Sequence, residues 1–545
     1  MKTASLLPGL LLGLLCLLLA PAAPAHAQTA APAGPARVSF RLEVKGKMTP
    51  AQQAHIGHLV ARTAQGDIRM PFGPEAQTFE LDLPADTLFP LGADLYRGFA
   101  VASVEINGRK LPKKQLRDLP DGLLTDRLAE VATGSDGASV KVTLRTDPRS
   151  RARYLAYSPG PDGQPYRIPA LAATPNGHLL AFFDSRPCGG DIGYGEVDVQ
   201  WRLSRDGGRT WSAAETLADG QGGESGWQVG FGDAAVAADA DRDEVVVMMV
   251  CGKTVCWHGN YLPGDPASNP NRVARVRGRF NKDLDRWEFT EPEEVTESIY
   301  SLFVDGGRPT VQSLFIGSGK MAQSRHDGPG SRRRIYCAVW TKNEGNRVVY
   351  SDDFGSTWHI LGNVHDRPAP HGDEPKCEEL PDGSVILSSR KAGGRYFNVF
   401  RFTDRAAGLG AWDSPVASDE VEGGLRFGRN STNGEVLLVE NARERATGRP
   451  CRVLLQTVPA GEGRSDVSVY YRILREGEAL SAETLAKGWQ LGRHVSRRGS
   501  AYSTLVEQAD GRLGLFFEEE PAWYCLVYLP LTLEEATAGA CRKAK

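Results

Sequence analysis

An all-β fold is predicted by three features of this 545-residue chain. Glycine and proline are abundant, with 61 and 34 residues, and the sequence has ten tryptophans but no long stretch of helical periodicity. This composition is typical of many short strands joined by turns. The third feature is a repeat, since Ser204–Trp211 and Ser351–Trp358 carry Ser, Asp, Gly, Thr and Trp at identical offsets. Such self-similarity predicts one supersecondary unit that recurs along the chain.

Each copy of the repeat follows an alternating apolar run, so it is expected to turn one strand into the next. Within the turn, Asp would accept backbone N–H bonds, Gly would supply a positive φ, and Trp would pack against neighbouring strands. Weaker relatives lie at three further places, 283–287, 404–412 and 475–489. The tryptophans of the five copies recur about every 70 residues, enough for a four-stranded sheet with one long loop. Residues 151–545 are therefore predicted to form a six-bladed β-propeller.

Residues 1–27 are expected to be a secretory signal peptide. Met1-Lys2 precede a leucine-rich run from Leu6 to Ala20, and Ala25-His26-Ala27 has the small-residue pattern of a cleavage site. The alternative is a membrane anchor, but the apolar run is short for a membrane span. The mature protein is therefore expected to be secreted or periplasmic, with no integral membrane segment after cleavage, in a compartment where disulfides can persist.

Eight cysteines would remain after Cys16 leaves with the signal peptide. Their pairing cannot be predicted from the sequence, because eight cysteines allow many connectivities. Cys251 and Cys256 are close enough for a local loop, but no histidine or second cysteine pair accompanies them at metal-ligand spacing. A zinc site is therefore not expected.

An Ala/Pro-rich linker at 28–37 is expected to lead into a small β-sandwich at 38–150. Strand patterns are found at four places, Val38–Val44, Thr78–Leu83, Ala100–Ile106 and Ser139–Leu144, with a helical insertion near Pro50–Thr63. The segment contains no acid/base cluster, so it is interpreted as an accessory domain. Sugar binding and a plain spacer role both stay open.

The charge balance argues against a bulk electrostatic partner. Lys and Arg number 64 and Asp and Glu number 67, so the chain is nearly neutral. Nucleic acid and anionic membrane surfaces are bound by strongly basic faces, and neither is expected as a partner here. Any affinity for an anion must be built locally from a few side chains.

Five motifs between Arg153 and about Leu533 resemble, in the same order, the catalytic domain of bacterial secreted exo-α-sialidases (neuraminidases) with Asp-box repeats. The first motif is Tyr166-Arg167-Ile168-Pro169, and the Asp-box repeats follow it. The resemblance implies a propeller that acts without a metal or organic cofactor. It implies sialylated glycoproteins, glycolipids or oligosaccharides as substrates, and it leaves the oligomeric state open.

Three arginines hold the carboxylate of sialic acid in this family. The resemblance assigns the first place to Arg167, the second to Arg390 and the third to Arg464, with Arg452 and Arg472 as rivals for the third. A planar carboxylate accepts two parallel N–H bonds from one guanidinium and further bonds from others. Three arginines at strand ends would therefore select an acidic sugar over a neutral one.

The acid/base loop of the family resembles the segment from Phe183 to Asp191. In this segment Asp191 takes the place of the general acid/base, and Arg186 that of a residue lining the pocket and contacting the substrate. Asp184 and Asp198 stay open as alternatives, because a shift of alignment is easy among the glycines of this loop.

The tyrosine nucleophile of the family resembles Tyr502, in the run Ser500–Leu505 that precedes Asp510–Glu518. A core tyrosine in a buried strand would fit the same run. A phenol with a pKa of about 10 needs a base beside it to act as a nucleophile, and the resemblance assigns this role to Glu374.

The implied mechanism is hydrolysis with retention through a sialyl-tyrosine intermediate, an exception to the two-carboxylate rule of glycosidases. A neutral phenol avoids much of the repulsion that a carboxylate nucleophile would meet from the carboxylate of the substrate. Two alternatives stay open. One is a trans-sialidase that transfers the sialyl group to another sugar, for which Trp523 and Tyr524 could provide an aromatic platform. The other is a non-catalytic propeller that binds glycans.

Overall fold

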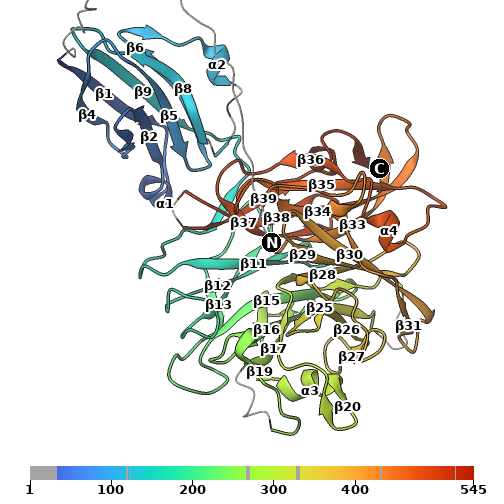
Figure 1. Cartoon of the computed structure of the whole chain (residues 1–545). Coiled ribbons are helices and arrows are strands. Elements are labelled where there is room, and N and C mark those ends of the chain that lie inside the picture. Colours follow the sequence, from blue (N-terminus) through green and yellow to red (C-terminus); the bar gives the residue numbers. More distant parts are fainter. Residues whose placement is uncertain are drawn as a thin grey trace, which may run out of the picture.

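The protein is described by a computed structural model that covers residues 34–544 except 118, 120, 123, 266–270, 327–331, 430, 431 and 522. The expected signal peptide and most of the expected linker lie outside the described residues. The described residues form many strands and a few short helices (Figure 1), which confirms the all-β prediction. No helix among them is long and apolar enough to cross a membrane.

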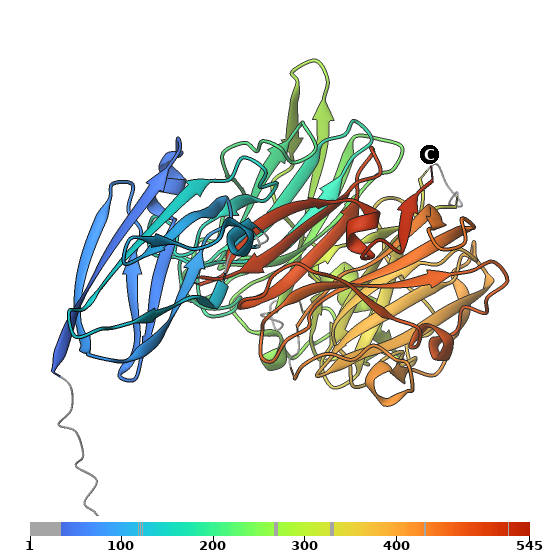
Figure 2. The ribbon, with the colours of Figure 1, turned by 90° about the horizontal axis from the view of Figure 1, so that it is seen from above.

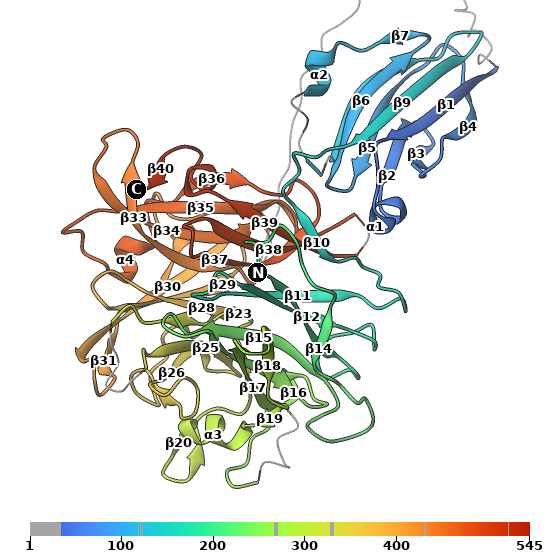
Figure 3. The same ribbon diagram turned by 180° about the vertical axis from the view of Figure 1, so that it is seen from behind.

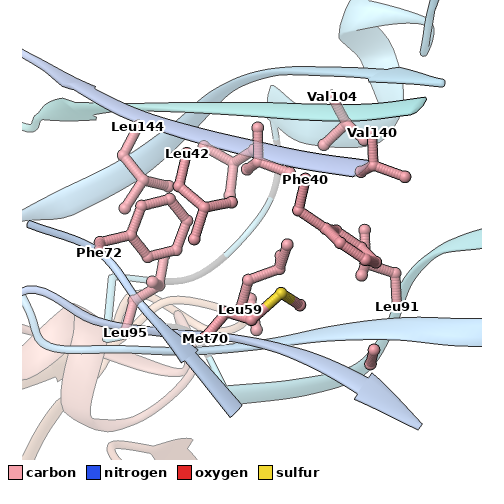
Figure 4. Close-up of a cluster of buried hydrophobic side chains, with 14 of the residues drawn as sticks. Phe40, Leu42, Leu59, Met70, Phe72, Leu91, Leu95, Val104, Val140 and Leu144 are labelled. Carbon is pink, nitrogen blue, oxygen red and sulfur yellow. The ribbon is translucent and has the colours of Figure 1, made fainter. Parts of the chain in front are cut away.

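Strands β1 to β9 form two sheets around one apolar core (Figure 4), here called the N-terminal sheet pair. The strand orders are β4-β1-β9-β6-β7 and β3-β2-β5-β8. Phe40 of the first sheet and Leu59 and Leu91 of the second are completely buried between them. The elements are β1 (Pro35–Lys45), α1 (Pro50–Ala54), β2 (Gly57–Thr63), β3 (Gly66–Pro71), β4 (Gln77–Pro84), β5 (Leu88–Leu95), β6 (Phe99–Ile106), β7 (Arg109–Lys110), α2 (Lys113–Arg117), β8 (Leu124–Ala132) and β9 (Ala138–Thr146).

The four predicted strands are found as β1, β4, β6 and β9, but the helix expected over Pro50–Thr63 is wrong after its first turn. The helix α1 ends at Ala54, and β2 then pairs with β3 and β5. Gly57 begins β2 with a φ of 118°, where a Cβ atom would lie 2.2 Å from the carbonyl oxygen of Asp94. After this glycine, Leu59 and Ala61 alternate into the core, so the strand period prevails over the helical one.

Strands β10 to β40 form six sheets of four or more strands, and these sheets follow one another in chain order. The six sheets together are here called the ring. In Figure 1 these sheets follow one another from teal through green and yellow to red. The inner strands contact each other in succession, from β11 to β15, β22 and β24, β28, β33 and β37, and β37 contacts β11 again. Strand β10 (Arg153–Ala156) pairs with β39 (Cys525–Leu531) in Figure 3, so the two ends of this region close the ring.

The ring strands are, in sheet one, β11 (Tyr166–Ala173), β12 (Leu179–Ser185), β13 (Asp198–Ser204) and β14 (Glu215–Ala218); in sheet two, β15 (Phe231–Ala238), β16 (Glu244–Cys251), β17 (Arg272–Asn281), β18 (Arg286–Phe289), β19 (Glu293–Glu294) and β23 (Gly319–Lys320); in sheet three, β22 (Leu314–Ile316), β24 (Ala322–Gln323), β25 (Ile335–Thr341), β26 (Gly345–Ser351) and β27 (His359–Ile360). Sheet four contains β28 (Asp373–Glu379), β29 (Val385–Lys391), β30 (Gly394–Asp404), β31 (Leu409–Trp412) and β32 (Val416–Ala417); sheet five contains β33 (Val436–Glu444), β34 (Pro450–Pro459), β35 (Val467–Leu474), β36 (Gln490–His494) and β40 (Cys541–Lys543). Sheet six contains β37 (Ser500–Glu507), β38 (Leu513–Glu519), β39 and β10. The connections hold the hairpin β20 (Val304–Asp305) and β21 (Arg308–Pro309) and the short helices α3 (Thr296–Tyr300), α4 (Ala482–Leu485) and α5 (Leu533–Ala536).

The repeated sequence pattern forms the same turn in sheets one and three. The Asp206 carboxylate accepts bonds from the N–H groups of Arg209 and Thr210 at 3.0 and 2.9 Å, and Asp353 accepts the equivalent bonds at 2.9 and 2.8 Å. The tryptophans of the five copies lie in, or a few residues before, the outermost strands of sheets one to five, β14, β18, β27, β31 and β36. The prediction that the repeat builds sheets is confirmed.

Candidate functional site

The side chains that the sequence singled out gather at two adjoining cavities at the inner ends of the ring strands. A cavity of about 740 Å³ is lined by Asp191, Glu374, Arg390, Arg464 and Tyr502, among others. A second cavity of about 620 Å³ is lined by Arg167 and Arg186. The seven residues come from four different sheets or the loops beside them, so the ring brings together positions that are more than 300 residues apart in the sequence.

The rival arginines for the third position lie elsewhere. Arg472 lines a separate cavity of about 770 Å³, where its guanidinium binds Glu478 and donates to the carbonyl of Lys487 at 2.7 Å. Arg452, on β34, lies 3.5 Å from the carboxylate of Glu440 on β33. Of the three candidates, Arg464 is the one that the structure places beside Tyr502.

Tyr502 and Glu374 are in direct contact at the floor of the larger cavity. The Tyr502 hydroxyl donates a short hydrogen bond to Oε1 of Glu374. One guanidinium nitrogen of Arg390 lies 2.9 Å from Oε2 of Glu374 and 3.4 Å from the Tyr502 oxygen. Arg390 also lies 3.4 Å from the Asp373 carboxylate. A phenol, a carboxylate and a guanidinium therefore form one connected group.

Guanidinium groups also flank the ring of Tyr502. The Cζ atoms of Arg167 and Arg464 lie 5.2 and 5.5 Å from the centre of the phenol ring. Burial raises the pKa of the Tyr502 phenol well above its usual value, the negative charge of Glu374 raises it further, and the three arginines oppose this rise. The resting phenol is therefore neutral, and its hydroxyl is hydrogen-bonded to the carboxylate that would accept its proton.

Glu518 is a buried residue of β38 that the sequence reasoning did not single out. Its carboxylate accepts bonds from Arg167 at 2.7 and 3.1 Å, from the N–H of Ile168 at 2.9 Å and from the N–H of Tyr502 at 3.1 Å. One side chain thus fixes an arginine of the site and the backbones of two inner strands. The signal that could have found it is the run of three glutamates, Glu518–Glu520, that follows the apolar run Leu513–Phe517.

β-Bulges occur in the inner strands at the positions of the site residues. The strand register shifts between Arg167 and Ala170, between Asp373 and Pro375, and between Ser500 and Ser503. A bulge turns a side chain away from the regular alternation of its strand. Ile168, in the first bulge, has a φ of 59°, which is strained for a β-branched residue and is held by its bond to Glu518. The bulges direct the site residues toward the ring axis.

The acid/base candidate Asp191 lies on a loop and is half exposed. One nitrogen of Arg186 is 2.9 Å from Asp191 and 2.9 Å from the buried Asp184, which makes Asp184 a support of Arg186. Asp233, an acidic residue in an apolar run that the sequence reasoning missed, lines the same cavity and donates its N–H to Asp184. Burial raises the pKa of the Asp233 carboxyl well above its usual value, and the nearby Asp191 and Asp184 add to this effect.

The other alternative, Asp198, lies on β13 and accepts the N–H of Gly220 at 2.9 Å. Burial raises the pKa of its carboxyl to about 6, although the bond from Gly220 acts in the opposite direction. A raised pKa in the folded state means that its contribution to stability is full below the unfolded value of about 4 and is lost as the pH rises through 6.

Replacing Asp198 by Asn tests this reading. Between pH 4 and pH 8 we expect the unfolding free energy of the wild type to fall by about 1 kcal/mol more than that of Asp198→Asn. The difference is this small because solvent screens part of the charge on the carboxylate. Urea unfolding at the two pH values measures the difference, and kcat/KM should stay within about twofold of the wild type. Identical pH dependence in the two proteins, or a large loss of activity, would contradict the assignment.

No protein-family model matches the sequence. The sialidase of Micromonospora viridifaciens is 28% identical to the chain over 418 residues, which are 75% of this chain and 59% of that protein. The chain is similar to a sialidase over three quarters of its length. It spans less than two thirds of the length of this relative, so the activity of the whole relative does not transfer to it directly.

Solved sialidase structures have the same fold as this chain. The Hadza microbial sialidase Hz136 superposes with a TM-score of 0.55 at 17% identity, covering 93% of this chain and 94% of the other. A leech intramolecular trans-sialidase also superposes with a TM-score of 0.55, at 12% identity, covering 93% and 95%. Sialidase structures are β-propellers, and this chain superposes on the two named here over 93% of its length.

Within the ranges that the structure describes, no three His, Cys, Asp or Glu side chains gather as metal ligands would. The eight cysteines that follow the expected signal peptide are free thiols, and seven of them are at least partly buried.

Proposed function

We propose that this protein is a secreted or periplasmic exo-α-sialidase that hydrolyses terminal α-linked sialic acids of glycoproteins, glycolipids or oligosaccharides. The observation that carries the proposal is the contact between the Tyr502 hydroxyl and the Glu374 carboxylate in a cavity that Arg390 and Arg464 also line. A neutral phenol bonded to a base and surrounded by guanidinium groups suits attack on a sugar that carries its own carboxylate.

Binding would be governed by the three arginines and an apolar wall. Arg390 and Arg464 face the larger cavity, and Arg167 reaches the Tyr502 ring from the adjoining one. A substrate carboxylate between them would accept charge-assisted bonds from several donors. Val255, Phe315 and Trp340 line another side of the cavity, where an N-acyl group would find apolar contacts.

The reaction would proceed in two steps with overall retention. In the first step Glu374 takes the phenolic proton, the Tyr502 oxygen forms a bond to the anomeric carbon, and Asp191 protonates the departing glycosidic oxygen as its bond to that carbon breaks. In the second step Asp191 accepts a proton from water, the water oxygen bonds to the anomeric carbon, and the phenol leaves and regains its proton from Glu374. Arg390, 3.4 Å from the phenol oxygen, would stabilise the negative charge that develops there in both steps.

We further propose that the ring at 151–545 is a six-bladed β-propeller and that 38–150 is a β-sandwich accessory domain. Six sheets in chain order, successive contacts between inner strands and closure by β10 and β39 support the propeller. The shared apolar core of the N-terminal sheet pair supports the sandwich.

Incubation with a fluorogenic sialoside and with sialyllactose, followed by chromatography of the products, tests the function. The proposal predicts release of free sialic acid as the α-anomer, which NMR detects before mutarotation. Release of the β-anomer would contradict retention. Binding of sialosides without turnover would favour the glycan-binding propeller.

The role of Asp191 is tested by Asp191→Asn with two leaving groups. A natural sugar leaving group needs protonation, whereas an acidic phenol leaves without much help. We expect kcat for sialyllactose to fall by about 10²-fold or more and kcat/KM for the aryl sialoside to fall much less. Equal losses for both substrates would contradict a role as general acid.

Transfer to another acceptor is a second candidate function, because Trp523 and Tyr524 line the cavity next to Arg167. The Trp523 side chain is 55% exposed and could stack against an acceptor or leaving sugar. The structural neighbour from leech is described as an intramolecular trans-sialidase complexed with 2,7-anhydro-Neu5Ac. Product analysis with added lactose separates the three outcomes, free sialic acid, a new sialoside and the 2,7-anhydro sugar.

A further inference from the structure

We propose that the N-terminal sheet pair helps to form the catalytic site, because two buried arginines at its border position the strand that carries Tyr502 and the loop that carries Arg464. The positioning residues are Arg97, which comes from the sheet pair, and Arg498, which comes from the ring. The activity test of this positioning role rests on the proposed sialidase function. A second test, by hydrogen exchange, does not depend on that function. It assigns a role to a segment that carries no acid/base group of its own.

Arg97 reaches out of the N-terminal sheet pair and is held by the ring. Its guanidinium donates two bonds to the Glu519 carboxylate, at 2.7 and 2.6 Å, and one to the carbonyl of Val495 at 2.8 Å. The Arg97 and Glu519 side chains are only 5% and 1% exposed. The pair therefore lies in the interior, with the fork of the arginine matched to a planar carboxylate.

Glu519 is the neighbour of Glu518 on β38, and the two carboxylates serve opposite sides of the strand. Glu519 accepts from Arg97, whereas Glu518 accepts from Arg167 and from the N–H groups of Ile168 and Tyr502. Adjacent strand residues point to opposite faces, so a shift of one carboxylate moves the other. The end of β38 is thus fixed by the sheet pair on one face and holds the site on the other.

Arg498 makes the second connection. Its side chain is 2% exposed, lies 3.3 Å from the Asp94 carboxylate, and donates to the carbonyl oxygens of Leu95 and Glu520 at 2.8 and 3.0 Å. Its own carbonyl accepts the N–H of Asp466 at 3.0 Å. The arginine therefore ties residues 94–95 of the sheet pair to the loop that carries Arg464.

Both connections converge on the start of β37. Ser500 pairs with Glu519 across the strands, donates its N–H to the carbonyl of Arg464 at 2.8 Å, and lies two residues before Tyr502. Figure 2 shows the sheet pair, in blue, next to the red strands of sheet six. An aromatic contact adds to the junction, since His55 stacks on Tyr157 at 3.9 Å. The junction resembles a protein interior more than a flexible tether.

Replacing Arg97 by Met removes the positive charge, leaves Glu519 buried without it, and keeps an apolar stem of similar length. We expect kcat/KM for a fluorogenic sialoside to fall by about tenfold or more, through a higher KM and a lower kcat, because small misplacements of reacting groups are costly. Arg97→Lys, which keeps the charge, should recover most of this loss. Assays are made well below the unfolding temperature of each variant.

The matched control is Arg334→Met in sheet three. Arg334 is 3% exposed, donates two bonds to Asp352 at 2.7 and 2.8 Å, and lies over the ring of Tyr350, as Arg97 lies over that of Phe517. The Arg334→Met substitution should lower the unfolding temperature as Arg97→Met does, but it should keep kcat/KM within about twofold of the wild-type value. Equal losses of activity in the two variants, or unchanged activity in a folded Arg97→Met, would overturn the proposal. If Arg97→Met does not fold, Glu519→Gln, which keeps the shape of the side chain, replaces it under the same criteria.

Hydrogen exchange separates this inference from the proposed function. The amides of Ile168 and Tyr502 are held by Glu518, so peptides containing them should exchange faster in Arg97→Met and not in Arg334→Met. If the wild type neither binds nor cleaves sialosides, the function fails, yet faster exchange would still support the positioning role. Unchanged exchange in these peptides would overturn it whatever the activity.

Discussion

Replacing Tyr502 by Phe is expected to lower kcat for sialoside hydrolysis by about 10³-fold or more, because it removes the oxygen to which the proposed mechanism assigns the covalent bond with the sugar. Loss of the hydroxyl leaves the ring in place between the guanidinium groups of Arg167 and Arg464 and leaves Glu374 paired with Arg390 at 2.9 Å. Substrate binding should therefore be retained. Initial rates with a fluorogenic sialoside, together with the affinity for an unreactive sialic acid analogue, measure both effects.

The control for this prediction is Tyr336→Phe. Tyr336 is completely buried in sheet three, and its hydroxyl has no hydrogen-bond partner among the described residues. Removing it should change neither kcat nor the unfolding free energy by much. If Tyr502→Phe retained more than a tenth of the wild-type kcat, the assignment of Tyr502 as the nucleophile would be wrong.

The second large effect is expected for Glu518→Gln. The substitution keeps the shape of the side chain but replaces one acceptor oxygen by an NH₂ group, so a backbone N–H of Ile168 or Tyr502 would face a donor. It also leaves Arg167 without its carboxylate partner. We expect kcat/KM to fall by about 10²-fold, mainly through KM, and the unfolding free energy to fall by about 3 kcal/mol. Steady-state kinetics and urea unfolding measure the two quantities.

Asp352→Asn separates the loss of stability from the loss of function in this experiment. Asp352 is the carboxylate partner of Arg334, at 2.7 and 2.8 Å, in a sheet that does not carry the reacting groups. The Asp352→Asn protein should lose a similar amount of unfolding free energy as Glu518→Gln while keeping the wild-type kcat/KM. A Glu518→Gln enzyme with wild-type KM would show that Arg167 does not depend on Glu518 for its position.

Much of the ring could be predicted because its signals are local. Asp206 and Asp353 close their turns with bonds to residues three and four positions ahead. All the residues that form each of these bonds therefore lie within eight consecutive positions of the sequence. The helix expected over Pro50–Thr63 failed for the opposite reason. Residues 57–63 take their form from pairing with β3 and β5, and the contact of Gly57 with Asp94 is not visible in a window around it.

The candidate site was predictable to the extent that its residues lie in recognisable motifs. Tyr502, Glu374 and Arg390 were assigned one by one, and the structure places them in contact. Glu518 and Asp233 were not predicted because the role of each depends on partners far away in the sequence, Arg167 for Glu518 and Asp184 for Asp233. The role of Arg97 could not be predicted for the same reason, since 422 residues separate it from its partner Glu519.

The pairing of β10 with β39 has a consequence for the order in which the protein is made. The ribosome completes β10 early, but the strand that pairs with it begins 369 residues after the end of β10, so sheet six cannot be completed until synthesis is nearly finished. Arg167 lies just after β10, and Tyr502 and Glu518 lie just before β39. A chain truncated before β39 therefore lacks a complete sheet six, the sheet on which Tyr502 and Glu518 lie.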